Sequence, residues 1–156
     1  MEPAANVAHE ELPYDLSRFV AAQADMFDDA LAELQTGRKR GHWMWFIFPQ
    51  LRGLGVSATA QHFGLAGIGE ARAYLGHPLL GPRLVASVEA LLGLRGPTLS
   101  QIFGSPDDLK FASSMTLFAL ASDRQNDPFR RALALYCGGQ MDARTEKMLA
   151  GSARSV

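Results

Sequence analysis

The sequence predicts an all-α fold, a compact single-domain bundle of about eight helices, several of them short. Apolar residues recur at three- and four-residue steps, helix-capping residues stand where these runs begin, and glycines stand where they end. The chain offers no ladder of alternating strands. With 156 residues, 47% of them hydrophobic and 20% charged, it can bury one core and is too apolar to be disordered.

The first regular pattern runs from Leu16 to Leu34, with Asp and Glu residues between the apolar positions. It predicts one long amphipathic helix with a single continuous apolar face. Asp15 can cap the start of this helix, and Gly37 can end it.

A dense aromatic run follows, from His42 to Phe48. Periodicity alone does not separate helix from strand in so short a segment. We favour a buried helical turn, because nothing else in the chain offers a strand to pair with it. Pro49 ends the turn, since the residue before a proline is displaced from the α region.

Short elements surround a glycine-rich loop at 51–56. Ser57 can cap a short helix that stops at Gly64, and a second short helix is expected over 70–75.

The second half of the chain carries clearer helix signals. Pro78 at a first helical position opens a longer helix that ends at Gly93, and Thr98 with Gln101 forms a capping box for a single turn. The remaining helices are expected to begin at Ser105-Pro106, Asp127-Pro128 and Asp142 and to end near Ala121, Gly138 and Gly151.

The chain is expected to comprise a mobile leader at 1–13, the helical domain at 14–151 and a C-terminal tail at 152–156. The leader has no basic segment followed by an apolar one, as a secretory signal would. The longest strongly apolar run, 43–49, is far shorter than the roughly 20 residues that cross a membrane as a helix. The single cysteine, Cys137, excludes an intrachain disulfide framework. We therefore expect a soluble, cytoplasmic protein with no membrane partner.

Charge balance and residue spacing exclude several classes of function. Fifteen Lys and Arg against sixteen Asp and Glu give a net charge of −1, which argues against a nucleic-acid partner. The four histidines lack the four-residue spacing of a helical zinc pair, and there is no acidic calcium loop. No serine-nucleophile elbow is present either. The sequence therefore predicts no metal and no organic cofactor.

Polar residues at a helix start are candidates for anion binding. His77 directly precedes Pro78, so it is held extended at a helix N-cap, near free backbone N–H groups that favour an anion. Arg83 lies one to two turns inside that helix and can add charge-assisted hydrogen bonds. The alternative is a capping histidine and a surface arginine.

Two further segments suit a ligand with phosphate and a flat ring. Gly53 and Gly55 let backbone N–H groups converge before Ser57, as in a phosphate cradle, although a plain flexible loop has the same composition. Trp43 and Trp45 can stack on a flat ligand such as a nucleobase, or simply belong to a buried aromatic cluster.

Serine has a low helix propensity, so the serines inside the helix expected after Pro106 need an explanation. Lys110, Ser113 and Ser114 fall on neighbouring helix faces at three- and four-residue spacing. Close packing of small side chains is one reason, and a bound ligand is the other.

These segments together resemble a known family. The run His42–Gln50, followed by Gly53, Gly55 and Ser57, is similar to the signature of domain-of-unknown-function family eighteen-ten, sometimes labelled calpastatin-like. The resemblance covers roughly 14–149 and continues in Arg18-Phe19, Glu70-Ala71, Tyr74-Leu75, His77-Pro78, Arg83-Leu84, Asp108, Lys110, Ser113-Ser114, Gly139, Asp142 and Thr145.

The resemblance implies a compact multi-helical domain and no particular reaction. His62 departs from the family pattern, where a tyrosine is usual, so it is given no role. The signature includes polar residues as well as a core, which implies a shared functional pocket. These polar residues are His42, Gln50, Ser57, His77, Arg83, Lys110 and Ser113.

The leading hypothesis is a pocket for a small anionic ligand, nucleotide- or ADP-ribose-like, with hydrolysis or group transfer as the expected chemistry if a substrate is turned over. His42 is the candidate general acid or base, with Lys110 and Asp108 as second choices. The ligand-binding candidates are Trp43, Trp45, Gln50, Gly53, Gly55, Ser57, His77, Arg83, Ser113 and Ser114.

Two alternatives stay open. One is a protein-interaction or adaptor module in which the same polar residues are caps and buried hydrogen-bond partners. The other is single-stranded nucleic-acid binding through the tryptophans and the basic turn 38–40. The sequence alone identifies neither the ligand nor the oligomeric state.

Overall fold

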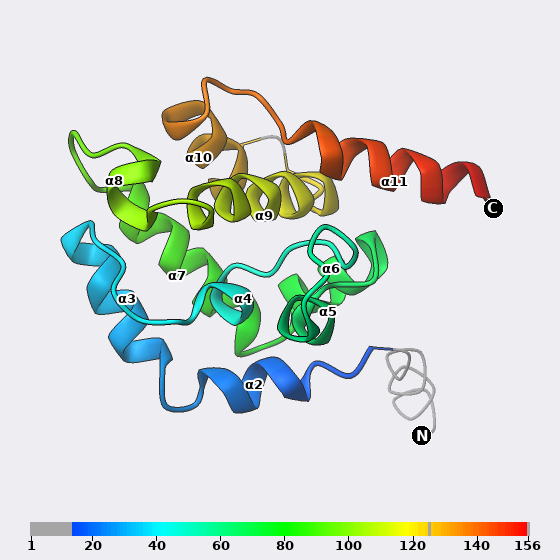
Figure 1. The fold of residues 1–156 in the computed structure, drawn as a ribbon, viewed down its shortest axis with the longest axis horizontal. Helices are drawn as coiled ribbons and strands as arrows, with labels where there is room; N and C mark the ends of the chain where they lie inside the picture. Colours follow the sequence, from blue (N-terminus) through cyan, green and yellow to red (C-terminus); the bar gives the residue numbers. More distant parts are fainter. Residues whose placement is uncertain (1–13, 125, 156) are drawn as a thin grey trace.

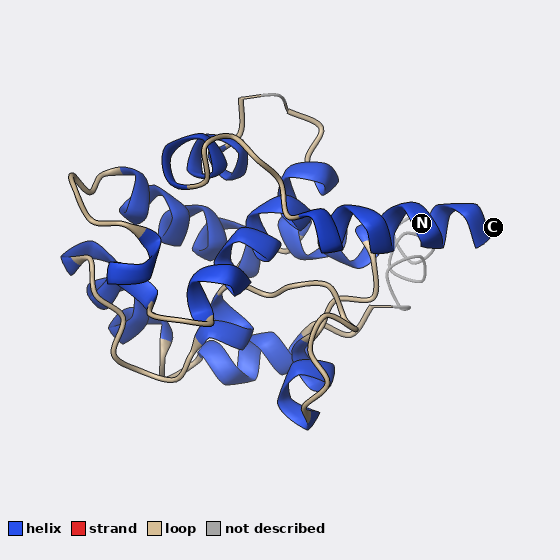
Figure 2. Cartoon of the chain, turned by 45° about the horizontal axis from the view of Figure 1, so that its top comes forward, coloured by secondary structure: helices blue, strands red, loops and turns tan. Residues whose placement is uncertain are grey.

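The structure is a computed structural model that describes residues 14–124 and 126–155. Every regular element in these ranges is a helix, which confirms the predicted all-α class (Figure 2). The β pairing found there is a single parallel bridge between Leu51 and Leu65. The leader expected at 1–13 lies outside the described residues.

The helices of the described residues keep the labels of Figure 1. They are α2 (Ser17–Gln23), α3 (Phe27–Thr36), α4 (Met44–Ile47), α5 (Ala58–Phe63), α6 (Ile68–Gly76), α7 (Leu80–Leu92), α8 (Leu99–Phe103), α9 (Asp107–Ala121), α10 (Pro128–Tyr136) and α11 (Ala143–Ser155).

Helix α9 is the centre of the bundle. It packs against α6, α8, α10 and α11, while α7 packs against α3, α6 and α10. In Figure 1, α10 lies above α9, α11 extends from its right end toward the C-terminus, and α4, α5 and α6 lie below it. From Ser113 to Ala119 every residue of α9 is buried. A helix that is buried on all sides needs small or apolar residues all round, and its sequence supplies them.

The single long helix expected over Leu16–Leu34 is wrong, because the chain turns between α2 and α3. The side chain of Gln23, the last residue of α2, is buried and donates to the backbone oxygen of Phe46 at 2.7 Å and to the Tyr74 hydroxyl at 3.0 Å. The break lets α2 pack against α4 while α3 packs against α7. No glycine or proline marks the break, so no local signal in the sequence predicts it.

Most of the expected helix ends are confirmed. Ser57 and Asp127 accept hydrogen bonds from the first turns of α5 and α10, and Thr98 with Gln101 forms the capping box of α8. Several ends differ from the prediction. Helix α7 begins at Leu80 with Leu79 as its N-cap, so Pro78 lies in the preceding turn and does not open the helix. The N-cap of α2 is Leu16, with no side-chain cap, so Asp15 is not its capping residue. Helix α9 begins after Pro106 with no side-chain cap, so Ser105 is not its capping residue. Helix α11 continues past Gly151 to Ser155.

Aromatic contacts join α4 to α9, and this junction positions the candidate site. The ring of Phe48, directly after α4, lies 5.0 Å from the ring of Phe111 in an edge-to-face arrangement, and Phe111 stacks on Phe103 at 5.2 Å. Such pairs each add about 0.5–1.5 kcal/mol beyond the apolar area that they bury. The aromatic run is therefore a helical turn, as predicted, and it is fixed against the central helix.

Deprotonation of the buried Tyr74 hydroxyl limits the stability of this core at alkaline pH. Burial raises the pKa of its hydroxyl above the ordinary value, and the Gln23 hydrogen bond and the Arg83 charge oppose this only in part. The hydroxyl of an unfolded tyrosine loses its proton near pH 10, whereas the buried Tyr74 hydroxyl is still protonated at that pH. This contribution to stability is therefore complete below about pH 10 and is lost as the pH rises, by about 1.4 kcal/mol per pH unit. We expect urea midpoints above pH 10 to fall less steeply for Tyr74→Phe than for the wild type; equal slopes would contradict the assignment.

Candidate functional site

A carboxylate fixes the loop that leads into α4. Glu33 Oε1 accepts hydrogen bonds from the backbone N–H of Arg40 at 2.7 Å, from that of Gly41 at 3.0 Å and from Trp43 Nε1 at 2.9 Å. Partial burial acts to raise the pKa of Glu33, but these hydrogen bonds together outweigh it and hold the pKa below its ordinary value. Trp43 itself is completely buried. The Trp43 indole therefore packs in the core and is hydrogen-bonded to Glu33.

Asp107 joins this loop to the start of α9. One carboxylate oxygen lies 3.0 Å from Lys39 Nζ, and the other lies 3.5 Å from Lys110 Nζ. The Lys110 ammonium lies 4.3 Å from the centre of the Trp45 ring, a cation–π contact. Two lysines thus share the Asp107 carboxylate, and the charge of Lys39 also acts on the nearby Glu33 carboxylate.

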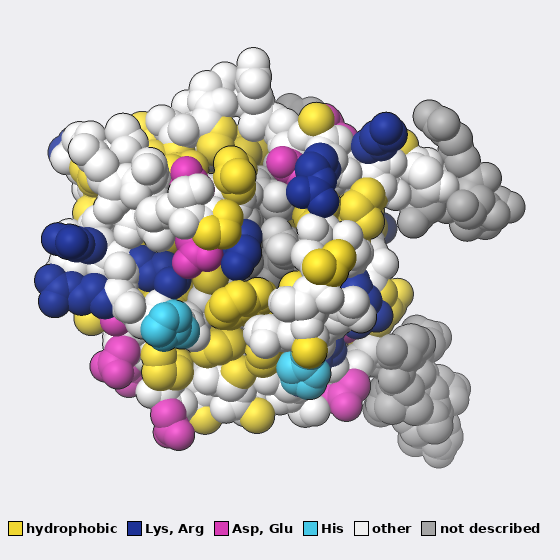
Figure 3. All heavy atoms as spheres, in the orientation of Figure 1, with side chains coloured by type: hydrophobic (Ala, Val, Ile, Leu, Met, Phe, Trp, Pro, Cys, Tyr) yellow, Lys and Arg dark blue, Asp and Glu magenta, His cyan; other side chains and the backbone are white. Residues whose placement is uncertain are grey.

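A hollow lies beside this pair, between α4, α5 and the first turn of α9. It contains about 230 Å³ of empty space that is partly open to solvent, and its interior has room for about one water molecule. In Figure 3, hydrophobic side chains surround a depression near the centre of this face, with Lys or Arg side chains close to it. Its lining residues are Met44, Trp45, Phe48, Gln50, Ala60, Phe63, Gly64 and Lys110.

Three residues predicted from the sequence meet at this hollow: Trp45, Gln50 and Lys110. The glycine-rich loop packs directly behind its wall. A Cβ on Gly55 would stand 2.8 Å from the Cβ of Ala60 and 3.9 Å from Gln50 Nε2, so only glycine lets the loop come this close. Ser57 is used as the cap of α5, where its hydroxyl accepts from the Ala60 N–H at 3.1 Å.

Helix α11 covers the other side of the glycine-rich loop. Gly53 has φ +104°, and a Cβ there would meet Met148 Cε at 2.9 Å. Arg144 donates to the backbone oxygen of Leu54 at 3.1 Å. These contacts fix the loop from outside, so its glycines serve close packing in this structure.

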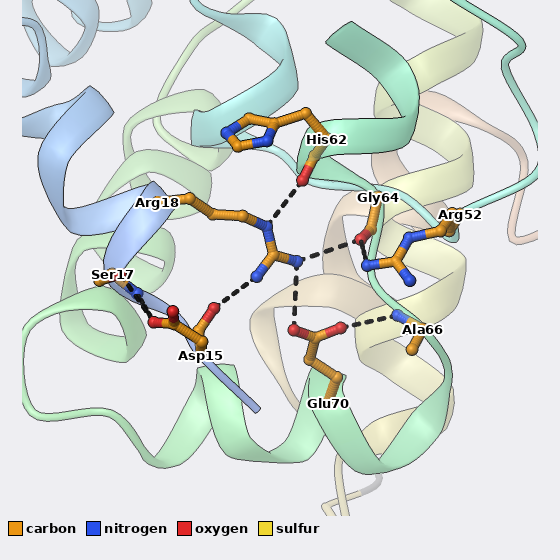
Figure 4. A network of polar contacts seen from close by, with 8 residues as sticks. All are labelled: Asp15, Ser17, Arg18, Arg52, His62, Gly64, Ala66 and Glu70. Atoms are coloured by element: carbon orange, nitrogen blue, oxygen red, sulfur yellow. Dashed lines mark hydrogen bonds and ion pairs between the residues drawn. The ribbon is translucent and has the colours of Figure 1, made fainter. Parts of the chain in front are cut away.

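A buried ion pair holds the α5 wall of the hollow in place (Figure 4). The Arg18 guanidinium donates to the backbone oxygens of His62 at 2.7 Å and Gly64 at 3.1 Å, and to Glu70 Oε2 at 3.1 Å. The other Glu70 oxygen accepts from the Ala66 N–H at 2.8 Å. The Arg18–Glu70 pair thereby joins α2, the end of α5 and the start of α6, behind Gly64.

The other predicted anion-binding residues lie away from the lining of the hollow. His42 is exposed, just before the buried Trp43. His77 Nδ1 accepts from the N–H groups of Leu79 at 3.1 Å and Leu80 at 3.2 Å, so the ring caps the first turn that leads into α7. Arg83 lies 4.7 Å over the ring of Phe27 and donates weakly to Gln23 Oε1, at 3.4 Å.

The remaining predicted residues lie along the first turns of α9. Asp108 accepts from the backbone N–H of Leu109 at 2.8 Å. Ser113 is buried, and its hydroxyl donates to the backbone oxygen of Leu109 at 3.1 Å. Ser114 is completely buried and its hydroxyl has no hydrogen-bond partner among the described residues.

Sequence reasoning missed most of the walls of the hollow. Phe63 and Gly64 come from the end of α5, and Asp107, the first residue of α9, pairs with both lysines. Arg18 and Glu70 stand far apart in the sequence, so no spacing rule pairs them. Their shared appearance in the family resemblance was the signal that could have drawn attention to them.

Two classes of feature are absent from the described residues. No group of three or more His, Cys, Asp and Glu side chains in 14–124 and 126–151 is arranged to hold a metal ion. No helix within the described part of the chain is long and apolar enough to cross a membrane.

The fold and the hollow define a small helical protein with a lysine-on-tryptophan contact beside a recess. Residues 13–149 match a family described as protein of unknown function (DUF1810), and the chain belongs to this family. A solved structure, that of the conserved hypothetical protein Rv1873 from Mycobacterium tuberculosis, is 54% identical in sequence, with a TM-score of 0.86 over 88% of this chain and 98% of that chain. No curated protein matches the chain.

Proposed function

We propose that this chain binds a small molecule with a planar ring and an anionic group, of the nucleotide or ADP-ribose type, at the hollow between α4, α5 and α9. The observation that carries the proposal is the position of Lys110. Its ammonium lies 4.3 Å over the Trp45 ring at the edge of the hollow, with the Asp107 carboxylate 3.5 Å away as its ion-pair partner.

The chemistry of the lining suits both parts of such a ligand. Lys110 offers a charged donor to an anion, and a charge-assisted hydrogen bond is roughly twice as strong as a neutral one. Trp45 offers the face of a large ring, and the Gln50 amide can both donate and accept. Phe48 and Phe63 keep water from the inner wall, which strengthens these polar contacts.

The size of the hollow limits how the ligand lies. Ligand pockets usually hold about 300–1,000 Å³, whereas the enclosed interior of this hollow has room for about one water molecule. In the proposal the ring therefore lies at the mouth of the hollow, on the Trp45 face that Lys110 leaves free when it swings away, and the anionic group stays beside Lys110. The side chain of Lys110 is 23% exposed, so solvent already reaches it and no core group has to move.

A second candidate, a protein-interaction module, is favoured by two exposed apolar side chains near the same elements. Leu109, next to Lys110, is 65% exposed, and Val56, in the loop before α5, is 87% exposed. Exposed apolar side chains suit contact with a protein surface where they form one contiguous patch. If the protein is an interaction module, Lys110 has only a structural role, and small anions do not change the melting temperature.

Thermal denaturation with AMP, ADP-ribose or inorganic phosphate separates the two candidates. A bound ligand at about 100 times its dissociation constant adds about 2.7 kcal/mol to the free energy of unfolding, a clear rise in melting temperature. We expect AMP or ADP-ribose to give this rise and phosphate alone to give less, because phosphate lacks the ring.

The matched variants are Lys110→Met and Lys147→Met. Both remove one positive charge, but Lys147 is exposed on α11 and does not line the hollow. Lys110→Met is expected to weaken binding by about tenfold or more, and Lys147→Met to leave it within about twofold. Equal losses of affinity in both variants would show general charge attraction. If none of the three compounds raised the melting temperature, the result would support the interaction module.

A further inference from the structure

The Asp107 carboxylate binds its two lysines unequally. Lys39 Nζ lies 3.0 Å from one carboxylate oxygen, and the Lys39 side chain is 9% exposed. Lys110 Nζ lies 3.5 Å from the other oxygen, and the Lys110 side chain is 23% exposed. An ion pair is stronger when it is shorter and less accessible to water. Lys39 is therefore the main partner of Asp107, and Lys110 is the secondary one.

The ammonium of Lys39 is also the more firmly fixed of the two. It donates to the backbone oxygen of Gly41 at 2.5 Å and lies 5.1 Å from the centre of the Trp43 ring, which is itself buried. The Lys110 ammonium makes one cation–π contact, at 4.3 Å from the centre of the Trp45 ring, which lies at the solvent-accessible hollow. Of the two ammonium groups, that of Lys110 is the one that can turn toward a ligand.

An anion bound at Lys110 has to compete with the Asp107 carboxylate. An anionic oxygen bound to an ammonium lies about 2.8 Å from it. While Lys110 stays in place, that oxygen is within about 6 Å of the nearer Asp107 oxygen, a distance at which two negative charges repel each other. If Lys110 turns away instead, its ion pair with Asp107 is lost. In both cases Asp107 lowers the affinity for the anion.

We infer that Asp107 is an internal competitor for the anionic group of the ligand, and that Lys39 is a positioning residue that keeps Asp107 paired so that Lys110 can bind the ligand. The inference rests on the proposed function and gives roles to two residues that do not line the hollow. When Lys110 turns to the ligand, Asp107 still has Lys39 at 3.0 Å. Without Lys39, the same movement would leave a partly buried carboxylate with no counter-charge, which costs more.

Four proteins test this inference: the wild type, Lys39→Met, Asp107→Asn and the double variant that combines both changes. Methionine keeps most of the apolar length of lysine, and asparagine keeps the shape of aspartate, so each change removes mainly one charge. Dissociation constants of AMP are measured by calorimetric titration at about 0.15 M salt, where distant surface charges are largely screened. We expect Lys39→Met to bind AMP about fivefold more weakly than the wild type and Asp107→Asn to bind it about fivefold more tightly.

The double variant separates the inferred role of Lys39 from simpler explanations. Once Asp107 is replaced by asparagine, Lys39→Met should change the affinity for AMP by less than about twofold, because no carboxylate remains for Lys39 to neutralise. Direct attraction between Lys39 and AMP, or a disturbed loop, would instead weaken binding equally in both backgrounds. Arg38→Met removes an exposed positive charge from the same loop and should leave the affinity within about twofold.

The outcomes distinguish this inference from the proposed function. If AMP binding depends on Lys110 but is unchanged in Asp107→Asn, or if Lys39→Met weakens it equally in both backgrounds, the inference is overturned and the proposed function stands. Binding that ignores Lys110, or no binding of AMP, overturns both.

A measurement without ligand tests the sharing of Asp107 separately. Lys110→Met is made in the wild type and in Lys39→Met, and urea midpoints are compared. In the wild type Asp107 keeps Lys39 when Lys110 is lost, whereas in Lys39→Met it loses its remaining lysine. We therefore expect Lys110→Met to lower the midpoint more in Lys39→Met than in the wild type. Equal decreases would show that the two lysines do not share Asp107, and would overturn the inference even if AMP binds.

Discussion

Replacement of Glu70 by alanine is expected to lower the free energy of unfolding by about 3–5 kcal/mol, the usual cost of removing one partner of a buried ion pair. The Glu70 side chain is 4% exposed and that of Arg18 is 16% exposed. Without the carboxylate, the guanidinium loses its counter-charge and the Ala66 N–H loses its acceptor. Urea denaturation followed by circular dichroism measures the change.

The matched control is Glu89→Ala, which removes a carboxylate from a surface pair. Glu89 lies 2.9 Å from Arg131, but the two side chains are 47% and 45% exposed. Exposed pairs contribute about 0–1 kcal/mol, so little change is expected. Similar losses in Glu70→Ala and Glu89→Ala would contradict the importance given to burial. The network also supports Gly64 in the wall of the hollow, so Glu70→Ala should weaken ligand binding as well.

Gly81→Ala is expected to cost about 3 kcal/mol, although alanine favours helices more than glycine does. Gly81 lies in the first turn of α7, and a Cβ there would stand 2.2 Å from the backbone oxygen of Leu75, in α6. Neither atom belongs to a flexible side chain, so the two helices must separate. The position needs glycine because the backbones of α6 and α7 approach closely there. Thermal and urea denaturation both report the loss.

Gly76→Ala is the control for this prediction. Gly76 is the last residue of α6, and a Cβ on it meets nothing within 4 Å. The variant should be as stable as the wild type or more stable by up to about 1 kcal/mol, as helix propensity indicates. If Gly81→Ala also left stability unchanged, the close approach of the two helices would be wrong.

The helix ends could be predicted from the sequence because they depend on neighbouring residues. Ser57, Thr98 and Asp127 cap helices through groups three residues away, which spacing alone identifies. The break between α2 and α3 could not be predicted in this way. It is stabilised by Gln23 reaching Phe46 and Tyr74, residues that are distant in the sequence.

The candidate site shows the same limit. Residue type identified Trp45, Gln50 and Lys110, and the fold brings them together, because α4 is fixed on α9 by aromatic contacts. His77 and Arg83 have equally suitable chemistry, but their side chains contact local partners outside the lining of the hollow. A single sequence does not show which polar side chains share a tertiary surface.

Fluorine NMR of the protein labelled with 5-fluorotryptophan, titrated with AMP, tests ligand binding at the hollow most directly. The chain has two tryptophans, and Trp45→Phe assigns their resonances. Trp43 is completely buried and bonded to Glu33, whereas Trp45 lines the hollow beneath Lys110. The proposed function predicts a saturable shift of the Trp45 resonance while that of Trp43 stays in place. A titration that leaves Trp45 unmoved, or that moves only Trp43, would contradict it.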